Sequence, residues 1–446
     1  MLMPKYDVRN YGAVGDGVTV VTSSIQAAID QCHKDGGGTV LLEAGHYVCG
    51  TLFLRSNVEL HIHISATLVA SGNIEHYSSN THYNRYVHET DMDPCFIYAE
   101  DAENIAISGL GEIEGNAEAF PNKGSIYRPM MIRLLRCHNV RVSNLRLTNA
   151  AAWTTAFLDS SHIWAEELTI KNTKKLNGDG LDFDGCHHVY VSNCYIEGTD
   201  DNLCLQAGSQ QYPVHDIHIS NCSFTSICAG IRIGLKSVGD IFNVTVNNCT
   251  FHKIWREGVK IECTEGGSIS DITMTNLLMR NVRRPLFILL NNRFAEIGSS
   301  IGLTSMPPIG IMERIRIIGL TATDDNEMAK THFRFEDDVM GSPRFNGIKI
   351  DAANGHPIRK LHLRDLVYTS YGGVKISEIP SDYPEVVDLQ SASPQNRVDN
   401  YWPDWSRAAF LDIRNVSHLK MDNLIFESTH PDERPPVIIE NCEQDT

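Results

Sequence analysis

Three aspartates in the middle of the chain have the residue type and the spacing for acid–base chemistry. The stretch Asn177-Gly-Asp179-Gly-Leu is followed by Gly-Thr-Asp200-Asp201-Asn-Leu, so Asp179 and Asp201 each precede a leucine by two positions. If both leucines open strands of neighbouring coils, the two carboxylates lie at the strand spacing of about 4.8 Å, with Asp200 beside them. Carboxylates this close repel one another, so at least one of them is expected to have a raised pKa.

Hydrolysis of a glycosidic bond fits such a group of acids. One protonated carboxyl group donates a proton to the leaving oxygen. One ionised carboxylate acts as the base for a water molecule or as a nucleophile. Two other interpretations remain open from spacing alone. Asp and Gly are ordinary turn residues, and clustered carboxylates also bind calcium.

An internal repeat of roughly 27 residues would position these aspartates. Four copies share a strand-like run that ends in asparagine, and these asparagines are 28, 27 and 28 residues apart: Asn193, Asn221, Asn248 and Asn276. Each run alternates apolar and polar residues, as in Val189-Tyr-Val-Ser-Asn193, which is typical of a half-buried strand. Asparagine tolerates a left-handed backbone and ends the strand in a turn. Weaker copies begin at Ile105, Val140, Ile315, Leu361 and Leu419.

Short apolar runs between these copies predict further strands, at Leu181, Leu203, Ile231 and Val259. Two or three short strands in each repeat predict an all-β fold, a single-stranded parallel β-helix whose stacked asparagines hydrogen-bond between coils. A β-propeller would need blades of about 40 residues with antiparallel hairpins, and no such pattern is evident.

The ends of the chain fit a solenoid whose core needs a cap. Apolar residues at helical spacing predict an N-terminal capping helix over residues 22–34, stopped by Gly36-Gly-Gly. We expect one β-helix domain over residues 1–446, with the cap and first coils at about 1–70 and coils with inserted loops at about 95–430. Irregular stretches near 75–95, 290–312 and 368–410 are candidates for walls around a binding groove.

Composition excludes several classes of protein. With 42% hydrophobic and 21% charged residues in 446, the chain is not expected to be disordered. It has no apolar run long enough for a membrane-spanning helix. A formal net charge of −17 disfavours nucleic acid as a partner. The start of the sequence has no secretory signal pattern, and the twelve cysteines are expected to be buried free thiols, so a cytoplasmic location is predicted. The oligomeric state is not indicated.

Several motifs together resemble one known family. They are the opening YDVRNYGAVGDG, the run GGGTVLLEAGHYVCGTLFLRSNVELHI, Asn149-Ala-Ala-Ala-Trp153-Thr, Asn177-Gly-Asp179-Gly and Asp200-Asp201. Over nearly the whole chain the sequence resembles glycoside hydrolase family 28, the polygalacturonase-like enzymes. The resemblance implies a right-handed parallel β-helix and single-displacement hydrolysis with inversion, without a metal or other cofactor. It makes Asp200 the general acid, while Asp179 and Asp201 orient and deprotonate the attacking water. Asn177 supports Asp179.

The sequence departs from the family's pattern at three motifs. Gly178 stands where the family's Asn-Thr-Asp-Gly motif has threonine. Cys228-Ala229-Gly230 stands where the family has Gly-His-Gly, and Lys260-Ile-Glu262 stands where it has Arg-Ile-Lys. Strand alternation predicts that Arg232, Lys260 and Glu262 point outward to the groove, where they either bind substrate or form a surface ion-pair ladder. Trp153 is expected either to stack on a sugar or to pack as an ordinary aromatic residue.

The sequence therefore predicts an inverting glycosidase that acts on pectin-derived oligosaccharides (galacturonan or rhamnogalacturonan) or related plant oligosaccharides. Exo action is expected, because a cytoplasmic enzyme would meet only short imported chains and because the long insertions could block one end of the groove. A β-helix polysaccharide lyase and a non-catalytic carbohydrate-binding solenoid are the alternatives.

Overall fold

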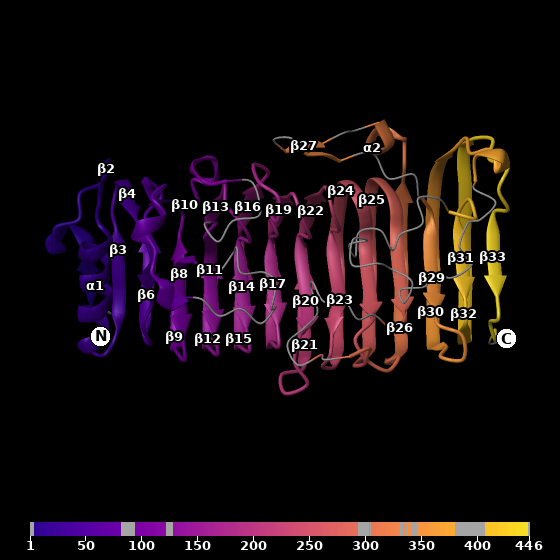
Figure 1. Ribbon diagram of the computed structural model, residues 1–446, viewed down its shortest axis with the longest axis horizontal. Helices are drawn as coiled ribbons and strands as arrows, with labels where there is room; N and C mark the ends of the chain where they lie inside the picture. Colours follow the sequence, from indigo (N-terminus) through magenta and orange to yellow (C-terminus); the bar gives the residue numbers. More distant parts are fainter. Residues whose placement is uncertain are drawn as a thin grey trace. The chain divides into compact units, whose positions relative to one another are not determined.

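The chain folds into parallel strands stacked in successive coils (Figure 1). The computed structural model describes residues 4–81, 94–121, 128–292, 303, 305–330, 333–335, 338–340, 346–379 and 406–444. Close packing divides the chain into two compact units. The first holds the described residues up to Asp200 together with Ile217–Cys222, and the second holds Asp201–Asp216 and the described residues from Ser223 onward. The parallel β-helix prediction is confirmed, whereas one domain over 1–446 stays a prediction.

In the first unit, three rows of parallel strands alternate along the chain. One row consists of β5 (Leu52–Phe53), β8 (Cys95–Glu100), β11 (Met130–Leu135), β14 (Thr155–Leu158) and β17 (Leu181–Asp184). The next consists of β1 (Lys5–Asp7), β3 (Gly38–Leu42), β6 (Val58–Ile62), β9 (Glu103–Gly109), β12 (His138–Ser143), β15 (Ser161–Glu166) and β18 (His187–Ser192). The last consists of β2 (Asp16–Val20), β4 (Gly45–Cys49), β7 (Ala66–Ala70), β10 (Glu112–Glu114), β13 (Arg146–Thr148), β16 (Thr169–Asn172) and β19 (Tyr195–Gly198).

In the second unit, two long strands run through a whole coil. They are β24 (Ile241–Cys263) and β25 (Ser268–Leu290). Their C-terminal ends belong to one row of strands with β20 (Leu203–Ala207), β23 (Ile231–Ser237), β29 (Ile348–Ala352), β31 (Leu411–Arg414) and β33 (Val437–Glu440). Their N-terminal parts belong to another row of paired parallel strands. This row goes on with β26 (Ile311–Thr323), β30 (Ile358–Gly372) and β32 (Val416–His430). The other strands are β21 (Val214–Ser220), which crosses the boundary between the units, β22 (Ser223–Ser226), and the antiparallel pair β27 (Phe333–Phe335) and β28 (Asp338–Met340).

The rows differ in how they are buried. β14 and β17 in the first unit, and β20 and β29 in the second, are buried at every position, whereas β18 alternates between buried and half-buried residues. A strand that is buried on both faces carries near-continuous apolar or internally paired residues, and an alternating strand has one face in solvent. Two of these fully buried strands, β17 and β20, directly follow the candidate aspartates Asp179 and Asp201.

The predicted asparagine turns are confirmed. Asn193, Asn221, Asn248 and Asn276 all have φ between 52° and 57°, the left-handed region that asparagine tolerates better than most residues. In the second unit, the amide of Asn276 donates to Oδ1 of Asn248 at 3.2 Å. In the first unit, Asn139 donates to Asn104 at 2.7 Å. The repeat therefore combines a turn in each coil with a side-chain hydrogen bond between coils.

Replacing Asn248 with Ala is expected to destabilise the protein more than replacing it with Gly. Alanine in the left-handed region costs roughly 1–2 kcal/mol, and both substitutions lose the bond from Asn276. Glycine adopts this conformation without that cost. Urea midpoints of the two variants measure the difference, and an N248A protein as stable as N248G would contradict the role given to the turn.

The predicted N-terminal helix is α1 (Thr22–Lys34), 13 residues long, which buries Ile25, Ala28, Ile29 and Cys32. It ends before Gly36, whose φ of 98° continues the chain in a left-handed turn. Thr22 does not cap the helix, because its Oγ1 accepts a hydrogen bond from the amide of Gly50 at 2.8 Å. The other helices within the described residues are one turn of α-helix, α2 (Glu327–Lys330), and the 3-10 helices η1 (Val8–Tyr11), η2 (Ile74–His76), η3 (Ser79–Thr81), η5 (Ala117–Ala119) and η6 (Ile376–Glu378).

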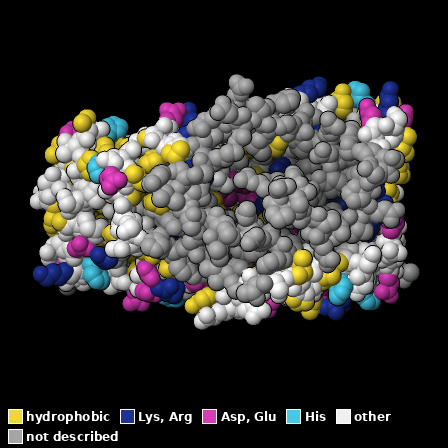
Figure 2. Space-filling model, viewed as in Figure 1, with side chains coloured by type: hydrophobic (Ala, Val, Ile, Leu, Met, Phe, Trp, Pro, Cys, Tyr) yellow, Lys and Arg dark blue, Asp and Glu magenta, His cyan; other side chains and the backbone are white. Residues whose placement is uncertain are grey.

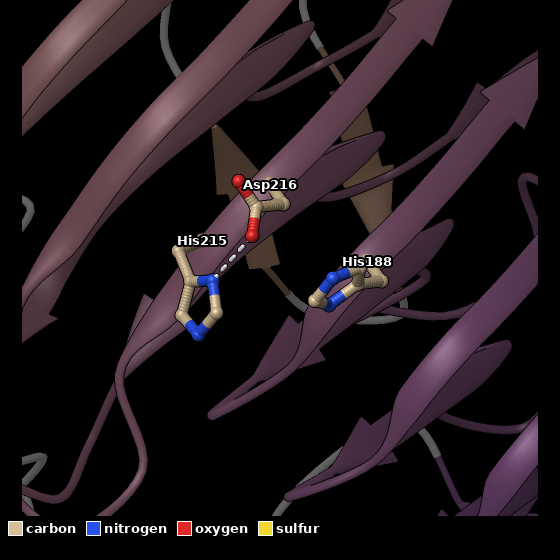
Figure 3. A group of neighbouring side chains, drawn as sticks. All are labelled: His188, His215 and Asp216. Carbon is tan, nitrogen blue, oxygen red and sulfur yellow. Dashed lines mark hydrogen bonds and ion pairs between the residues drawn. The ribbon is translucent and has the colours of Figure 1, made fainter.

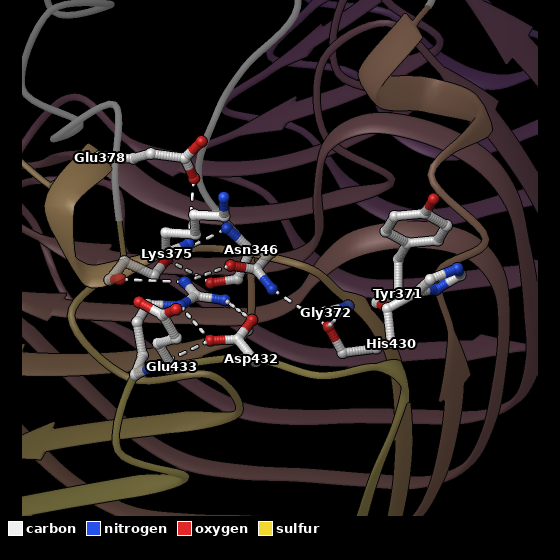
Figure 4. A network of polar contacts seen from close by, with 12 residues as sticks. Asn346, Tyr371, Gly372, Lys375, Glu378, His430, Asp432 and Glu433 are labelled. Carbon is white, nitrogen blue, oxygen red and sulfur yellow. Dashed lines mark hydrogen bonds and ion pairs between the residues drawn. The ribbon is translucent and has the colours of Figure 1, made fainter.

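A polar network ties the loops beyond β30 and β32 in the second unit (Figure 4). The buried guanidinium of Arg434 donates to Asn346 at 2.7 Å and pairs with Asp432 at 2.8 Å. Nearby, the amide of Ile376 donates to Glu433 at 3.0 Å. Burial opposes ionisation of Asp432, but Arg434 outweighs it and lowers the pKa of that carboxyl group. The hydrogen bonds from Arg434 to Asn346 and from Ile376 to Glu433 thus join the loops, and the charge pair with Asp432 holds the guanidinium of Arg434 in place.

The cysteines, the charged side chains on the surface and the lengths of the helices test the predictions made from composition. All twelve cysteines are free thiols, and all but Cys442 are buried, as predicted. Cationic and anionic side chains intersperse on the described surface in Figure 2. Among the described residues, no helix combines the length and the apolar character needed to cross a membrane. The predicted groove walls near 75–95, 290–312 and 368–410 fall largely outside the described residues, which omit 82–93, 293–302 and 380–405.

Candidate active site

In the first unit, the turn that carries Asn177 and Asp179 leads directly into β17. The backbone amide of Thr154 donates to the carbonyl oxygen of Asp179 at 3.1 Å. On the other side, the amide of Gly178 donates to Oγ1 of Thr199 at 3.0 Å. The turn is therefore fixed by backbone groups from both sides, and Asp179, 5% exposed, is buried in it. Thr199 also brings the turn next to the segment that ends in Asp200.

Gly178 explains one departure from the family motif. A Cβ atom at this position would lie 2.6 Å from the carbonyl oxygen of Asn172 and 2.6 Å from Oγ1 of Thr199. Real Cβ contacts are essentially never that short, so a threonine here would force the turn apart. The space is already filled by Thr199, whose hydroxyl holds the turn instead.

Arg128 is a residue that sequence reasoning missed. Its side chain is 1% exposed and donates through Nη2 to Oδ1 of Asn177 at 2.9 Å and through Nη1 to the carbonyl oxygen of Leu176 at 2.9 Å. The guanidinium thereby fixes both the position of Asn177 and the orientation of its amide. No motif surrounds Arg128, and it lies far from Asn177 along the chain, so the sequence holds no signal for this contact.

In the second unit, Asp201 is fully buried among donors. Nη1 of Arg232 lies 2.8 Å from its Oδ2, and the amide of Ala229 donates to its Oδ1 at 3.0 Å. The thiol of Cys204 donates to Oδ2 at 3.7 Å. Burial opposes ionisation, but Arg232 and Lys260 outweigh it and hold the pKa of Asp201 below its ordinary value. Asp201 is therefore not the carboxyl group that repulsion was expected to raise, and a calcium ion at Asp201 would meet the charge of Arg232. Asp200, the preceding residue, is half-buried.

Ala229 occupies the position where the family motif has histidine. It is completely buried, and its methyl group offers no proton donor, but its amide makes the bond to Asp201. Gly230 next to it has no room for a side chain, since a Cβ atom would lie 2.5 Å from the ring of Phe251. At the position of the family's histidine, Asp201 therefore receives a hydrogen bond from a backbone amide and not from a side chain.

The basic and acidic residues of the second unit form a ladder of alternating charge. Nε of Arg232 lies 3.7 Å from Oε2 of Glu262, and Nζ of Lys260 lies 3.6 Å from the same oxygen. Nζ of Lys260 also lies 3.8 Å from Oε2 of Glu257, which in turn lies 3.8 Å from Nε of Arg256. Strand pairing places Arg232 directly opposite Lys260, so that both cations reach Glu262 from neighbouring strands. With Asp201 at its end, each charge in this ladder faces the opposite sign.

The expectation that Arg232, Lys260 and Glu262 point out to an open groove needs correction. The Lys260 and Glu262 side chains are each 1% exposed and that of Arg232 is 14% exposed. The ion-pair ladder considered from sequence exists, but it is buried rather than on the surface. Charges in the interior are stable only when they are paired, and this pairing is what the ladder supplies. Glu257 was missed, because it falls where the register of β24 shifts.

The comparisons with known proteins identify the chain's relatives. The sequence model of glycosyl hydrolases family 28 matches residues 46–308, which include all the motifs from Asn149 to Glu262. The chain belongs to this family. A probable polygalacturonase of Vitis vinifera is 25% identical over 297 residues, covering 61% of this chain and 60% of that protein. An endo-polygalacturonase of Pectobacterium carotovorum subsp. carotovorum is 27% identical over 294 residues, with coverages of 60% and 72%. This family 28 chain thus spans about 60% of the length of its Vitis relative.

Solved structures agree on the fold. A family 28 exopolygalacturonase of Yersinia enterocolitica superposes with a TM-score of 0.69 at 19% identity, covering 99% of this chain and 78% of that one. An exopolygalacturonase of Thermotoga maritima gives a TM-score of 0.66 at 19% identity, with coverages of 82% and 87%. At this level of identity the likeness supports the parallel β-helix of this family 28 member.

Trp153 and a group of histidines complete the description of the candidate residues and their surroundings. Trp153 of this family 28 chain is 8% exposed, which favours the packed aromatic residue over a sugar-stacking platform. In the second unit, Nδ1 of His215 lies 2.8 Å from Oδ2 of Asp216 (Figure 3). In the first unit, His188 stacks on His162 with ring centroids 4.6 Å apart. The imidazole groups of His215 and His188 are thus engaged in contacts of their own.

Proposed function

We propose that the chain is an inverting glycosidase whose general acid is Asp200. The observation that carries the proposal is the family 28 match over residues 46–308, within which Asp179, Asp200 and Asp201 stand at the motif positions. The local chemistry of Asp201 supports it, since a carboxylate with a lowered pKa stays ionised in the interior. Oligosaccharides or polysaccharides are the substrates that the family implies.

In the proposed step, a water molecule attacks the anomeric carbon while the glycosidic C–O bond breaks. Asp200 gives its proton to the leaving oxygen, and Asp179 takes the proton that the water loses, so atoms and charges balance. Asp201 orients the water. We give the base role to Asp179 because the charge of Arg232 makes Asp201 a weak base. Asn177, held by Arg128, supports Asp179.

Pectin-derived oligosaccharides, from galacturonan or rhamnogalacturonan, are the proposed substrates, with cleavage from the chain end. The names of relatives support the substrate class. They include the Pectobacterium endo-polygalacturonase and a Dickeya chrysanthemi exo-poly-alpha-D-galacturonosidase that is 24% identical over 67% of this chain.

A polysaccharide lyase fits the second unit less well. Such an enzyme uses an unprotonated Arg or Lys to remove a proton next to a uronate carboxylate. Burial lowers the pKa of Arg232, but Asp201 and Glu262 outweigh this effect and raise it well above the ordinary value. Nζ of Lys260 lies between the carboxylates of Glu257 and Glu262, and its side chain is only 1% exposed. Arg232 is thus held protonated, and Lys260 is enclosed in ion pairs.

Incubation with defined oligogalacturonides and rhamnogalacturonan oligosaccharides is expected to release mainly monomers or dimers at early times. Proton NMR of the first product should show the anomeric configuration opposite to that of the cleaved bond. Early products of mixed length would contradict exo action, and retained configuration would contradict the single displacement. Unsaturated products absorbing in the ultraviolet would establish the lyase instead.

A further inference from the structure

A groove of about 620 Å³ lies on the outward face of the second unit, on a different row of strands from the ladder. Its residues come from β24, β25, β26, β30 and β32, which pair in this order (Figure 1). The polar residues of the groove were not candidate site residues in the sequence analysis, and the proposed reaction does not use them.

One side of the groove is a straight line of cross-strand partners. It consists of Thr245, Thr273, Arg316, His362 and Lys420. The line begins with two hydroxyl groups and continues with cationic or basic side chains. Arg316 and Lys420 are two strands apart, so their charges are spaced by about 10 Å along the groove.

The other side of the groove is a line of left-handed residues. Asn243, Asp271, Arg314, Lys360 and His418 have φ between 55° and 57°. A left-handed residue at the same position in five strands bends each strand in the same way, which hollows the sheet between the two lines. Asn and Asp suit this conformation, whereas Arg and Lys adopt it at a cost of roughly 1–2 kcal/mol. The later coils therefore carry a cation at a position where Asn would be the less strained residue.

The groove is positively charged in a strongly negative protein. Four Arg and Lys residues and one Asp line it, a formal charge of +3, against −17 for the whole chain. Arg314 pairs with Asp271 at 2.6 Å and also with Glu313, so its charge is neutralised. Among the described residues, Arg316 and Lys360 have no anionic partner within ion-pair distance, and Lys420 lies 4.0 Å from Asp422. The charge that is left faces solvent and is free to attract an anion.

We propose that this groove binds an acidic oligosaccharide, with sugar carboxylates against Arg316, Lys360 and Lys420. The hydroxyl group of Thr273 and the amide oxygen of Asn243, whose Nδ2 donates to Asp216, supply hydrogen-bond partners for sugar hydroxyls. The spaced cations fit a linear chain that bears carboxylates at intervals. The choice of a sugar acid rests on the proposed function, and the groove itself would serve to retain the substrate chain at a second place on the protein.

The test is a variant that gives the later coils the residues of the earlier ones. Arg316→Thr and Lys420→Thr copy Thr245 and Thr273, and Lys360→Asn copies Asn243, so each new residue already occupies its row in this chain. Calorimetric titration with a defined oligogalacturonide at low salt is expected to show binding at least about tenfold weaker. A tenfold loss of affinity corresponds to about 1.4 kcal/mol, which the three lost contacts supply together. Asp200→Asn is present in every protein titrated, so that turnover does not consume the ligand.

The control variant removes three cations outside the groove. It carries Lys253→Asn at another left-handed position, Arg280→Thr on β25 and Lys34→Thr at the end of α1, all predicted to leave binding unchanged. Equal binding by the groove variant and the parent overturns the inference, as does equal loss in the control variant. Tight binding of poly-L-glutamate through the groove overturns the sugar assignment. If the native chain hydrolyses no pectic substrate but binds the oligogalacturonide through the groove, the proposed function fails and this inference stands.

Discussion

Replacing Asp200 with Asn is expected to lower the hydrolysis rate by about 10²–10⁴-fold, the usual contribution of a general acid. Asn has nearly the same shape but cannot give a proton to the leaving oxygen. Binding should be retained, because the loss falls on the transition state rather than on the bound ground state. Reducing-end release from pectic oligosaccharides measures the rate, and calorimetry with the same ligands measures the binding.

Asp365→Asn provides the matched control for this substitution. Asp365 is exposed, has a φ of 54° and accepts a hydrogen bond from Asn423 at 2.8 Å, which an asparagine oxygen can also accept. Its variant should hydrolyse the substrate at the native rate. A D200N protein that is as active as D365N would remove the assignment of the acid, and one that no longer binds would indicate a structural role for Asp200.

The repeat could be predicted from sequence because it depends on a local property, the left-handed backbone conformation at the end of a strand. Most coils place asparagine or aspartate where the backbone is left-handed, and alternation on both sides fixes the strands. Asn193, Asn221, Asn248 and Asn276 therefore mark the coils before any contact is known. The same reasoning placed Leu181 and Leu203 at the start of β17 and β20, two residues after Asp179 and Asp201.

Burial of the ladder could not be predicted in this way. Alternation correctly separates Arg232 and Lys260 from the isoleucines beside them, but it assumes that the opposite face of a strand meets solvent. Here both faces are buried, and what makes that possible is the pairing of Lys260 with Glu262 and with Glu257, a residue outside any regular position. Such pairing depends on side-chain geometry across strands. The contact between Arg128 and Asn177 is equally non-local.

Replacing Arg232 with Met is expected to cost about 3–5 kcal/mol of stability at neutral pH, because it leaves a buried carboxylate without its cation. Methionine keeps much of the length and apolar bulk of the arginine stem. Asp201 would then retain the amide of Ala229 and the charge of Lys260, but lose the contact at 2.8 Å. The urea midpoint measures the loss. Arg141→Met breaks an exposed pair with Glu166 at 2.9 Å and should cost less than about 1 kcal/mol.

The dependence on pH identifies the group responsible. In the native protein the pKa of Asp201 is lowered, so its ionisation contributes stability above the ordinary value near 4, and this contribution is lost as the pH falls through the lowered pKa. In R232M the burial of Asp201 is less opposed and its pKa rises. If it rises above the ordinary value, the deficit of the variant should grow as the pH increases from about 4 towards neutrality. Adding Asp201→Asn removes the charge and should recover part of the stability and abolish this slope. A deficit that is constant with pH, or unchanged in the double variant, would show that Asp201 is not the partner that makes Arg232 necessary.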